Sequence, residues 1–329
     1  IAGAEIAPER FADAIARTIH AADMVDRTAS PDGDVVTQFE LLAAAALCEF
    51  EQAGVEVAVV EAGLGGRYDA TNVVDSRVAV LTNVGLEHTR YLGPTVRHIA
   101  VEKLDVVRPG ATLVLGAGLE PDALEVAEAV AGERGATLVR AEAQLDVELV
   151  AAGAYQRHNF ATATAAASAF LGRPQDPGTI RAAGAAVTVP GRFDVHPGSP
   201  VVLFDVAHND GGIEALAESL PSFVAGRRLV AVVSILDDKD AAGMLRRLLR
   251  ECDALVCTGC TSPRALPGAT LASLVGQLGG SASAVRDPHV ALERARELAG
   301  PDGVVLATGS IYLIADLLRP PGAAGGSSL

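Results

Sequence analysis

Short apolar runs alternate with longer amphipathic segments along the chain. Residues 57–60 form one such run, Val-Ala-Val-Val. Continuous apolar runs of this length are typical of parallel strands that are covered on both faces. Further runs of this kind predict strands at residues 78–81, 112–115, 137–140, 201–204, 229–235, 254–257 and 304–307. Helical segments separate most of them, so the sequence predicts an α/β protein with mostly parallel sheets.

Two helices are expected ahead of the first apolar run. Residues 8–27 begin with Pro at the first turn and place their apolar positions on one stripe. Residues 37–53 end before Gly54, a residue that commonly stops a helix. Both predictions can be compared directly with the structure.

The helical pattern breaks at residues 188–193, where Pro and Gly follow an Ala-rich segment. We therefore expect a first domain over residues 1–186 and a second over residues 187–319. A length of 329 residues fits two domains of about 150 residues each. Residues 320–329 are rich in Pro, Gly and Ser, which predicts a flexible tail with nothing to bury.

The composition of the chain argues against nucleic acids and membranes as binding partners. The formal net charge is −15, aromatic residues make up 4% of the chain, and Trp is absent. A nucleic-acid-binding protein normally shows a basic patch, and a single-strand binder shows stacking aromatics, so neither is expected. The apolar runs are shorter than the roughly 18 residues that span a bilayer, so we expect no membrane association.

The cysteines indicate a reducing compartment. Four of them, Cys48, Cys252, Cys257 and Cys260, are too few for a disulfide scaffold at this length. The pair Cys257-x-x-Cys260 has no second pair beside it, which favours ordinary thiols over a zinc or redox site. We therefore expect a cytoplasmic protein.

A glycine-rich run follows the first predicted strand. Residues 61–74 read EAGLGGRYDATNVV, and Glu61 stands where the strand ends. Ligands of open α/β sheets bind at the carboxyl ends of strands, and a carboxylate there can hold Mg²⁺. The alternative is a glycine-rich turn with Glu61 solvated. A dinucleotide-binding fingerprint is a poor match, because the glycine spacing differs.

Two further groups follow along the chain. His88 lies in TNVGLEHTRYLG after the strand at 78–81, and Lys103 follows Glu102 on a helix that begins at about Pro94. Taken singly, a loop histidine or a helix lysine is more often solvated than functional. Together with Glu61 they offer a carboxylate, an imidazole and an amine, a set that suits a magnesium–phosphate site.

The second half of the chain carries its own candidates. Asn159, in HNFATATAA, either caps a helix or reads a purine edge. Asp205 and His208, in FDVAHN, follow the first strand of the second domain, where a ligand is expected. Arg192 lies in PGRFDV just upstream. Ser310, in GSIYLIADLL, either caps the last helix or binds an anion at its N-terminus.

Taken together and in this order, these runs, with DDKD at residues 237–240, resemble the folylpolyglutamate synthase/dihydrofolate synthase family of the Mur ligase superfamily. The resemblance implies an ATPase domain followed by a Rossmann-like C-terminal domain. It also implies an ATP-dependent ligase that converts the carboxylate of dihydropteroate or of a folate to an acyl phosphate, which the amine of L-glutamate attacks. The expected partners are ATP, L-glutamate and folate or dihydropteroate, and we expect a monomer.

The resemblance also implies roles for individual residues. Glu61 and His88 would hold Mg²⁺, and Lys103 resembles the family's carbamylated lysine, whose carboxylate helps hold metal. Asp69 and Phe39 resemble positions near the pteridine. The ATP contacts implied are Asn159, Arg192 and Asp205, with Arg192 and His208 also acting in catalysis. His208 and Ser310 would face the glutamate.

The family's Gly-x-x-Gly-Lys-Ser phosphate loop is not among these 329 residues, whose only lysines are Lys103 and Lys239. We therefore expect the first domain to lack its phosphate loop and this chain alone to be inactive. Three hypotheses stay open: a fragment of a working folate ligase, a shortened homologue that acts as a binding module, and an NAD(P)-dependent oxidoreductase. The last would need a Gly-x-Gly-x-x-Gly fingerprint, which we do not find.

Overall fold

The computed structural model describes residues 1–28, 35–142 and 145–320. The predicted tail at 320–329 therefore lies outside the described residues, apart from Pro320. The chain divides into two compact units, the first comprising residues 1–115 and 119–139 and the second beginning at residue 140 and including residues 116–118. By this division the segment 140–186 groups with the second unit, whereas the sequence analysis places it in the first domain; the domain limits at 186 and 187 stay a prediction.

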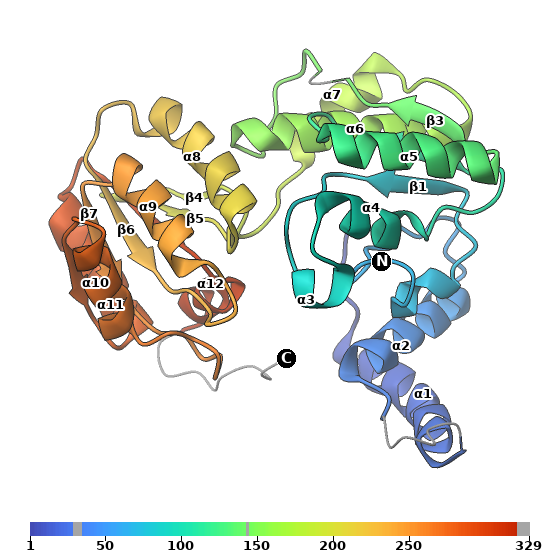
Figure 1. Ribbon diagram of the computed structural model, residues 1–329, viewed down its shortest axis with the longest axis horizontal. Helices are drawn as coiled ribbons and strands as arrows, with labels where there is room; N and C mark the ends of the chain where they lie inside the picture. Colours follow the sequence, from blue (N-terminus) through green and yellow to red (C-terminus); the bar gives the residue numbers. More distant parts are fainter. Residues whose placement is uncertain (29–34, 143–144, 321–329) are drawn as a thin grey trace. The chain divides into compact units, whose positions relative to one another are not determined.

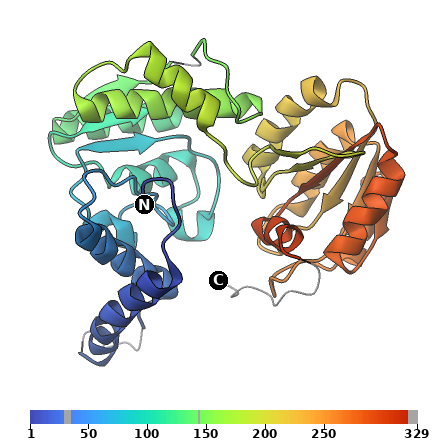
Figure 2. The same ribbon diagram turned by 180° about the vertical axis from the view of Figure 1, so that it is seen from behind.

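The first unit opens with two helices that pack side by side, α1 (Pro8–Thr28) and α2 (Gln38–Ala53) (Figure 1; seen from behind in Figure 2). Thr37 and Glu40 form a reciprocal capping box at the start of α2, and Gly54 ends it in the left-handed conformation. Glu49 of α2 is 3% exposed and pairs with Arg10 and Arg17 of α1. Both predicted helices are confirmed within a residue of their limits.

The rest of the first unit alternates strands and helices. It contains the 3₁₀ turn η1 (Ala70–Val73), β1 (Val78–Leu81), α3 (Thr89–Leu92), α4 (Val96–Leu104), β2 (Thr112–Leu115), α5 (Pro121–Arg134) and β3 (Thr137–Arg140). In the described part of this unit the sheet has the order β1-β2-β3, and β1 pairs with β2 in parallel. Apolar side chains of α4, α5 and the strands form its core. All three strands have their predicted limits.

The strand predicted at residues 57–60 is wrong. These residues form no ladder with any part of the chain that the structure describes, and the side chain of Val59 is 96% exposed. An apolar run becomes a buried strand only where neighbouring strands take up its backbone N–H and C=O groups and helices cover its faces. The run at 57–60 has neither here, so it stays an extended connection that leads to Glu61.

The second unit begins with α6 (Ala154–Leu171) and α7 (Pro177–Ala186), followed by a parallel sheet with alternating helices. The strands are β4 (Asp194–His196), β5 (Val201–Phe204), β6 (Leu229–Val233), β7 (Ala254–Cys257), β8 (Ala282–Ala284) and β9 (Val304–Thr308). Their order is β4-β5-β9-β6-β7-β8, with only the edge strand β4 antiparallel among the described pairs. The sequence analysis missed β4 and β8, which are three residues long and partly polar.

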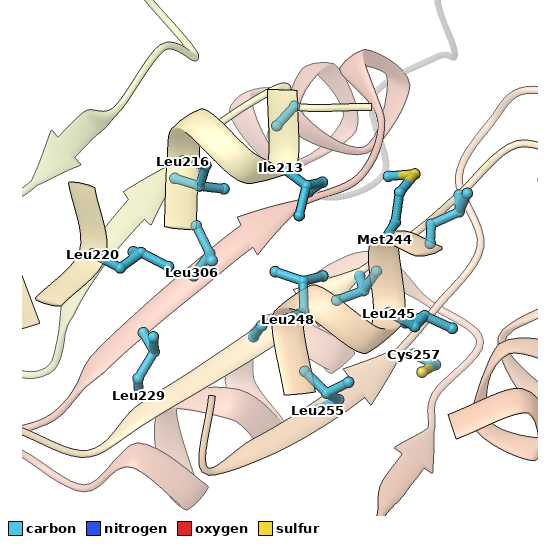
Figure 3. Packing of buried hydrophobic residues seen from close by; sticks show 14 of the residues in the cluster. Ile213, Leu216, Leu220, Leu229, Met244, Leu245, Leu248, Leu255, Cys257 and Leu306 are labelled. Atoms are coloured by element: carbon cyan, nitrogen blue, oxygen red, sulfur yellow. The ribbon is translucent and has the colours of Figure 1, made fainter. Parts of the chain in front are cut away.

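Helices cover both faces of this sheet. Successive residues of β6 point to opposite sides, so that Ala231 belongs to one apolar cluster and Val232 to the other. The first cluster lies beneath α8 (Asp210–Val224), α9 (Ala241–Glu251) and α10 (Gly268–Gln277), and the second beneath α11 (Pro288–Ala299) and α12 (Ile311–Leu318). Figure 3 shows side chains of α8 and α9 directed at the strands: Ile213, Leu216, Leu220, Met244, Leu245 and Leu248.

This arrangement fixes where a ligand site can form. β9 inserts between β5 and β6, and the helix that follows it covers the opposite face from the helices that follow β5 and β6. The loops after β5 and β9 therefore diverge at the carboxyl edge of the sheet, the point at which α/β proteins bind ligands. Asp205 and Ser310 stand there, directly beyond these two strands. The α/β fold with mostly parallel sheets is confirmed.

Candidate functional site

The glycine-rich loop of the first unit is held by Asp69. One carboxylate oxygen of Asp69 accepts the Leu64 N–H at 2.8 Å, and the other accepts the Thr71 N–H at 2.9 Å and the Thr71 hydroxyl. Burial raises the pKa of Asp69, but the hydrogen bonds from Thr71 and from the loop N–H groups outweigh burial, and its pKa lies below the ordinary value. Asp69 thus stays ionised and fixes the curve of the loop.

The same loop rests on the end of α4. A Cβ atom at Gly66 would lie 2.6 Å from the carbonyl oxygen of Glu102, so only glycine allows this approach. The Arg67 N–H donates to that carbonyl at 3.0 Å, and the Arg67 guanidinium pairs with the Glu102 carboxylate at 3.1 Å. These contacts bring the loop beside Lys103, which is half-buried on the same turn of α4.

Phe39 reaches the loop from another element. Its ring, which α2 carries, lies against Gly63, where a Cβ atom would come within 2.5 Å of the ring edge. Phe39 is 43% exposed, so one part of the ring packs on the loop while another part faces solvent. The structure therefore brings Phe39, Asp69 and Lys103 to one glycine-rich segment, although they lie far apart in the sequence.

Glu61 and His88 occupy exposed loop positions. Glu61 ends the extended segment 57–60, and His88 follows β1 with φ 49°, a left-handed conformation that is uncommon for residues other than glycine. Within residues 1–28, 35–142 and 145–320, no three His, Cys, Asp or Glu side chains are grouped to hold a metal ion. The predicted set contains only two such residues besides Lys103, so its role as a metal site stays a prediction.

Three segments of the second unit that carry predicted site residues meet at the carboxylate of Asp205. Asp205 is 2% exposed, and its oxygens accept the Ala207 N–H at 2.8 Å, the Phe193 N–H at 2.9 Å and the Tyr155 hydroxyl at 2.6 Å. Burial raises the pKa of Asp205, although these hydrogen bonds and the charge of Arg192 oppose the effect. Burial and the charge of Asp205 also raise the pKa of Tyr155.

Arg192 is an exposed side chain on a fixed backbone. Its neighbours Gly191 and Phe193 are both buried, and Phe193 adopts φ 49°. The Gly191 carbonyl accepts the Val206 N–H at 2.8 Å, which ties the turn at 190–193 to the loop after β5. The guanidinium lies close enough to influence Asp205 electrostatically and is otherwise presented to solvent.

The backbone around His208 sets its tautomer. Its Nδ1 lies 2.9 Å from the Val206 carbonyl oxygen. Because a carbonyl can only accept, Nδ1 carries the proton in this contact, and Nε2 is left with its lone pair in the neutral ring. Asn209 follows and caps α8 by accepting the Gly212 N–H at 2.7 Å.

Asn159 does not cap α6, and that alternative is wrong. The helix begins at Ala154 after Gly153, so Asn159 lies in its second turn, where its amide donates to Gln156 Oε1 at 3.0 Å. Ser310 does cap its helix, because its hydroxyl accepts the Tyr312 N–H at 3.1 Å. Ser310 is 1% exposed, and the Cys260 Sγ lies 4.0 Å from its hydroxyl.

The sequence analysis missed Tyr155 and a cavity. Tyr155 precedes HNFATATAA and carries no motif of its own, so only its contact with Asp205 reveals it. The cavity, of about 890 Å³, lies beyond β7 and β8 and is lined by residues that include Cys260, Arg286 and Asp316. Arg286 comes from a segment with no recognisable pattern, whereas Asp316 lies in GSIYLIADLL, and only the fold brings the two together.

The cysteines are free in the structure, and the choice of ordinary thiols over a zinc or redox site stays a prediction. All four are described and free. Burial raises the pKa of Cys257 to about 11, so it is protonated at neutral pH. None of the described helices has both the length and the apolar character that a membrane span needs.

Comparison with known proteins gives one consistent result. Residues 191–311 match the family described as Mur ligase, glutamate ligase domain. A dihydrofolate synthase/folylpolyglutamate synthase of Mycobacterium tuberculosis is 36% identical over 284 residues, which are 76% of this chain and 58% of the relative. The Escherichia coli protein of the same name is 34% identical over 307 residues, 88% of this chain and 71% of the relative.

A solved structure agrees in fold. The Mycobacterium tuberculosis folylpolyglutamate synthase complexed with ADP and AMPPCP superposes with a TM-score of 0.88 at 32% identity, covering 96% of this chain and 80% of that one. The matched stretch 191–311 contains Arg192, Asp205, His208 and Ser310. The chain therefore belongs to the dihydrofolate synthase/folylpolyglutamate synthase family of the Mur ligase superfamily.

Proposed function

We propose that the protein carrying this chain is an ATP-dependent ligase that joins L-glutamate to dihydropteroate or to the γ-glutamyl tail of a folate. The observation that carries this proposal is the match to a glutamate ligase domain over residues 191–311. In this segment the N–H groups of Phe193 and Ala207, which are next to Arg192 and His208, donate to the buried carboxylate of Asp205. This chain spans 58% of its Mycobacterium tuberculosis relative, so the activity concerns the whole protein.

The reaction has two steps. The substrate carboxylate attacks the γ-phosphorus of ATP, which releases ADP and forms an acyl phosphate. The amine of L-glutamate then attacks the acyl carbon, loses a proton and expels phosphate, leaving an amide. Solved relatives support these reactants, since an E. coli FolC holds DHPP and ADP and a bifunctional folylpolyglutamate synthase/dihydrofolate synthase holds Mn, AMPPNP and L-glutamate.

In the first unit we assign the metal and pteridine sides. Glu61, His88 and Lys103 in carbamylated form would hold Mg²⁺, and their oxygen-rich donor set suits that hard cation. The bound ion would neutralise charge on the transferred phosphoryl group. The half-buried Lys103 beside the loop is consistent with this role, because carbamylation changes its ammonium into an anionic oxygen ligand. Asp69 and Phe39 would border the pteridine.

In the second unit we assign the nucleotide and glutamate sides. The exposed amide of Asn159 and the guanidinium of Arg192 are free to contact ATP, and Arg192 would stabilise charge on the phosphate oxygens. Asp205, an expected ATP contact, is 2% exposed, which favours a role in holding the turn of Arg192. His208 Nε2 would receive the proton of the attacking amine. The first N–H groups of α12, which Ser310 caps, would face a glutamate carboxylate.

The test is a side-by-side assay with dihydropteroate and with tetrahydrofolate in the longest natural form of the protein. We expect phosphate release that depends on both L-glutamate and the pteridine substrate. Glu61→Ala and His88→Ala should abolish that release, and Lys103 should carry the extra mass of CO₂ under native conditions. Near-normal rates in the His88 variant would show that its metal role is wrong, and the absence of ligation with either substrate would favour a non-catalytic binding module.

Three further assignments concern the compartment, the oligomeric state and nucleic-acid binding. We propose that the protein works in the cytoplasm as a monomer and without nucleic acid, in keeping with the net charge of −15 and the four free thiols. We expect the 329-residue chain alone to show little ATP turnover.

A further inference from the structure

Tyr155 ties together three of the four segments that carry the proposed nucleotide and glutamate contacts of the second unit. It lies in the first turn of α6, four residues before Asn159. Its hydroxyl donates to Asp205 Oδ2 at 2.6 Å. The same oxygen accepts the Phe193 N–H, next to Arg192, and the other oxygen accepts the Ala207 N–H, next to His208. One carboxylate thus joins α6, the turn at 190–193 and the loop after β5.

The turn at 190–193 needs this support. Phe193 has φ 49°, a conformation that costs free energy for a residue with a side chain and persists only where surrounding contacts hold it. Phe193 is 3% exposed, and its ring packs edge to face against the ring of Phe223, with 5.3 Å between the two ring centroids. The hydrogen bond from the Phe193 N–H to Asp205 completes the constraint on the backbone side.

The start of α6 is anchored at a second point. The Ala154 N–H donates to the Ser219 hydroxyl of α8 at 2.9 Å, and Ser219 is itself 3% exposed. Because α6 has no side-chain cap, Ser219 and Tyr155 supply its specific contacts with the sheet unit at this end. Residues four apart lie on one face of a helix, so fixing Tyr155 also fixes the face that carries Asn159.

We propose that Tyr155 is a positioning residue of the ligase: through Asp205 it sets Asn159, Arg192 and His208 in register before ATP binds. This inference rests on the proposed function for its kinetic part. We assign the hydroxyl to Asp205 alone, with no contact to substrate or nucleotide. Its contribution is to keep the Asp205 carboxylate aimed at the two N–H groups, so that the exposed Arg192 side chain extends from a backbone that does not shift.

The first test is amide hydrogen exchange on the chain with Tyr155→Phe, which removes the hydroxyl and keeps the ring. We expect the Phe193 and Ala207 amides to exchange about tenfold faster, as suits the loss of one hydrogen bond to a charged group, while amides of β6 and β7 are unchanged. Tyr91→Phe is the matched control, because that side chain is 69% exposed. Unchanged exchange at Phe193 and Ala207 would overturn the proposal.

The second test is kinetic and uses the longest natural form. Tyr155→Phe should raise KM for ATP about tenfold and lower kcat by a smaller factor, since the reacting groups are retained but are less firmly held. In an Asp205→Asn background the same change should have little further effect, because both act through one contact. A KM equal to that of Tyr91→Phe, or additive effects of the two changes, would contradict the positioning role. If the unchanged protein shows no ligation, the proposed function fails, whereas the exchange result still decides the structural part.

Discussion

The two units contain apolar runs of similar length in very different surroundings. In the second unit, β6 has a strand on either side and helices on both faces, and its five residues are buried. In the first, the run at 57–60 pairs with none of the described strands, and Val59 is 96% exposed. The comparison teaches that such a run marks a segment able to become a strand, while its neighbours decide whether it does.

The two groups of proposed site residues also differ in burial and in how firmly hydrogen bonds hold them. Around Asp205, buried hydrogen bonds fix the backbone before any ligand arrives, and the functional side chains extend from it. Around the glycine-rich loop, Asp69 and Arg67 hold the chain in place, but Glu61 and His88 are exposed. We infer that the second unit holds its proposed site residues in place before a ligand binds. The exposed groups of the first unit would take up their final positions only with a ligand bound.

Apart from the complete loss of activity expected in the Glu61 and His88 variants, the largest expected effect concerns the preformed side. Arg192→Ala should lower the rate of glutamate-dependent phosphate release about 100-fold, because one charge that stabilises the transferred phosphoryl group is lost. Folding should be unaffected, since the side chain is exposed. Arg246→Ala on α9 is the control, as its side chain is also exposed and outside the proposed site. Equal rates in the two variants would remove Arg192 from the mechanism.

The next largest effect is expected on stability, and it tests the difference in burial between β6 and residues 57–60. Val232→Ala removes methyl groups from a fully buried site and should lower the free energy of unfolding of the second unit by about 2 kcal/mol. The same change at Val59 should alter stability by less than about 0.5 kcal/mol. Urea unfolding followed by circular dichroism measures both. A loss at Val59 as large as that at Val232 would mean that the run at 57–60 is buried in solution.

A smaller effect is expected at the helix pair of the first unit. Thr37→Ala breaks the capping box of α2 and should lower stability by about 1 kcal/mol. Hydrogen bonds from Thr37 lower the pKa of Glu40, so this contribution is present above the ordinary pKa of 4.5 and is lost as pH falls. Thermal unfolding of the two proteins across pH checks this, and a difference that persists unchanged in acid would contradict it.

The smallest effect is a difference in pKa between two carboxylates of the proposed sites, Asp69 and Asp205. Because the pKa of Asp69 lies below 3.8, its contribution to stability is present above that pH and is lost as pH falls through the folded value. Because burial raises the pKa of Asp205 above 3.8, the fold favours its protonated form, and this contribution is lost as pH rises through the folded value. Carbon-13 titration of the carboxyl groups should show Asp205 titrating at higher pH than Asp69; the reverse order would contradict the burial of Asp205.

Much of this architecture could be predicted from local patterns. Gly54 and Ser310 act as helix signals because their effects are confined to neighbouring residues, and the strand at 112–115 is apolar after Thr112. β4 could not be predicted, since it pairs with β5 at the sheet edge and contains Asp194 and His196. Tyr155 could not be predicted either, because its role depends on Asp205, fifty residues away.

The central claim is that the protein makes an amide through an acyl phosphate. Its most direct test supplies a dihydropteroate or folate in which both oxygens of the reacting carboxylate are ¹⁸O, together with ATP and L-glutamate, and measures the label in the released phosphate. The account predicts one ¹⁸O atom in the phosphate for each amide bond formed, and neither label transfer nor amide in His88→Ala. Unlabelled phosphate from a reaction that makes the amide, or label transfer unchanged in that variant, would contradict it.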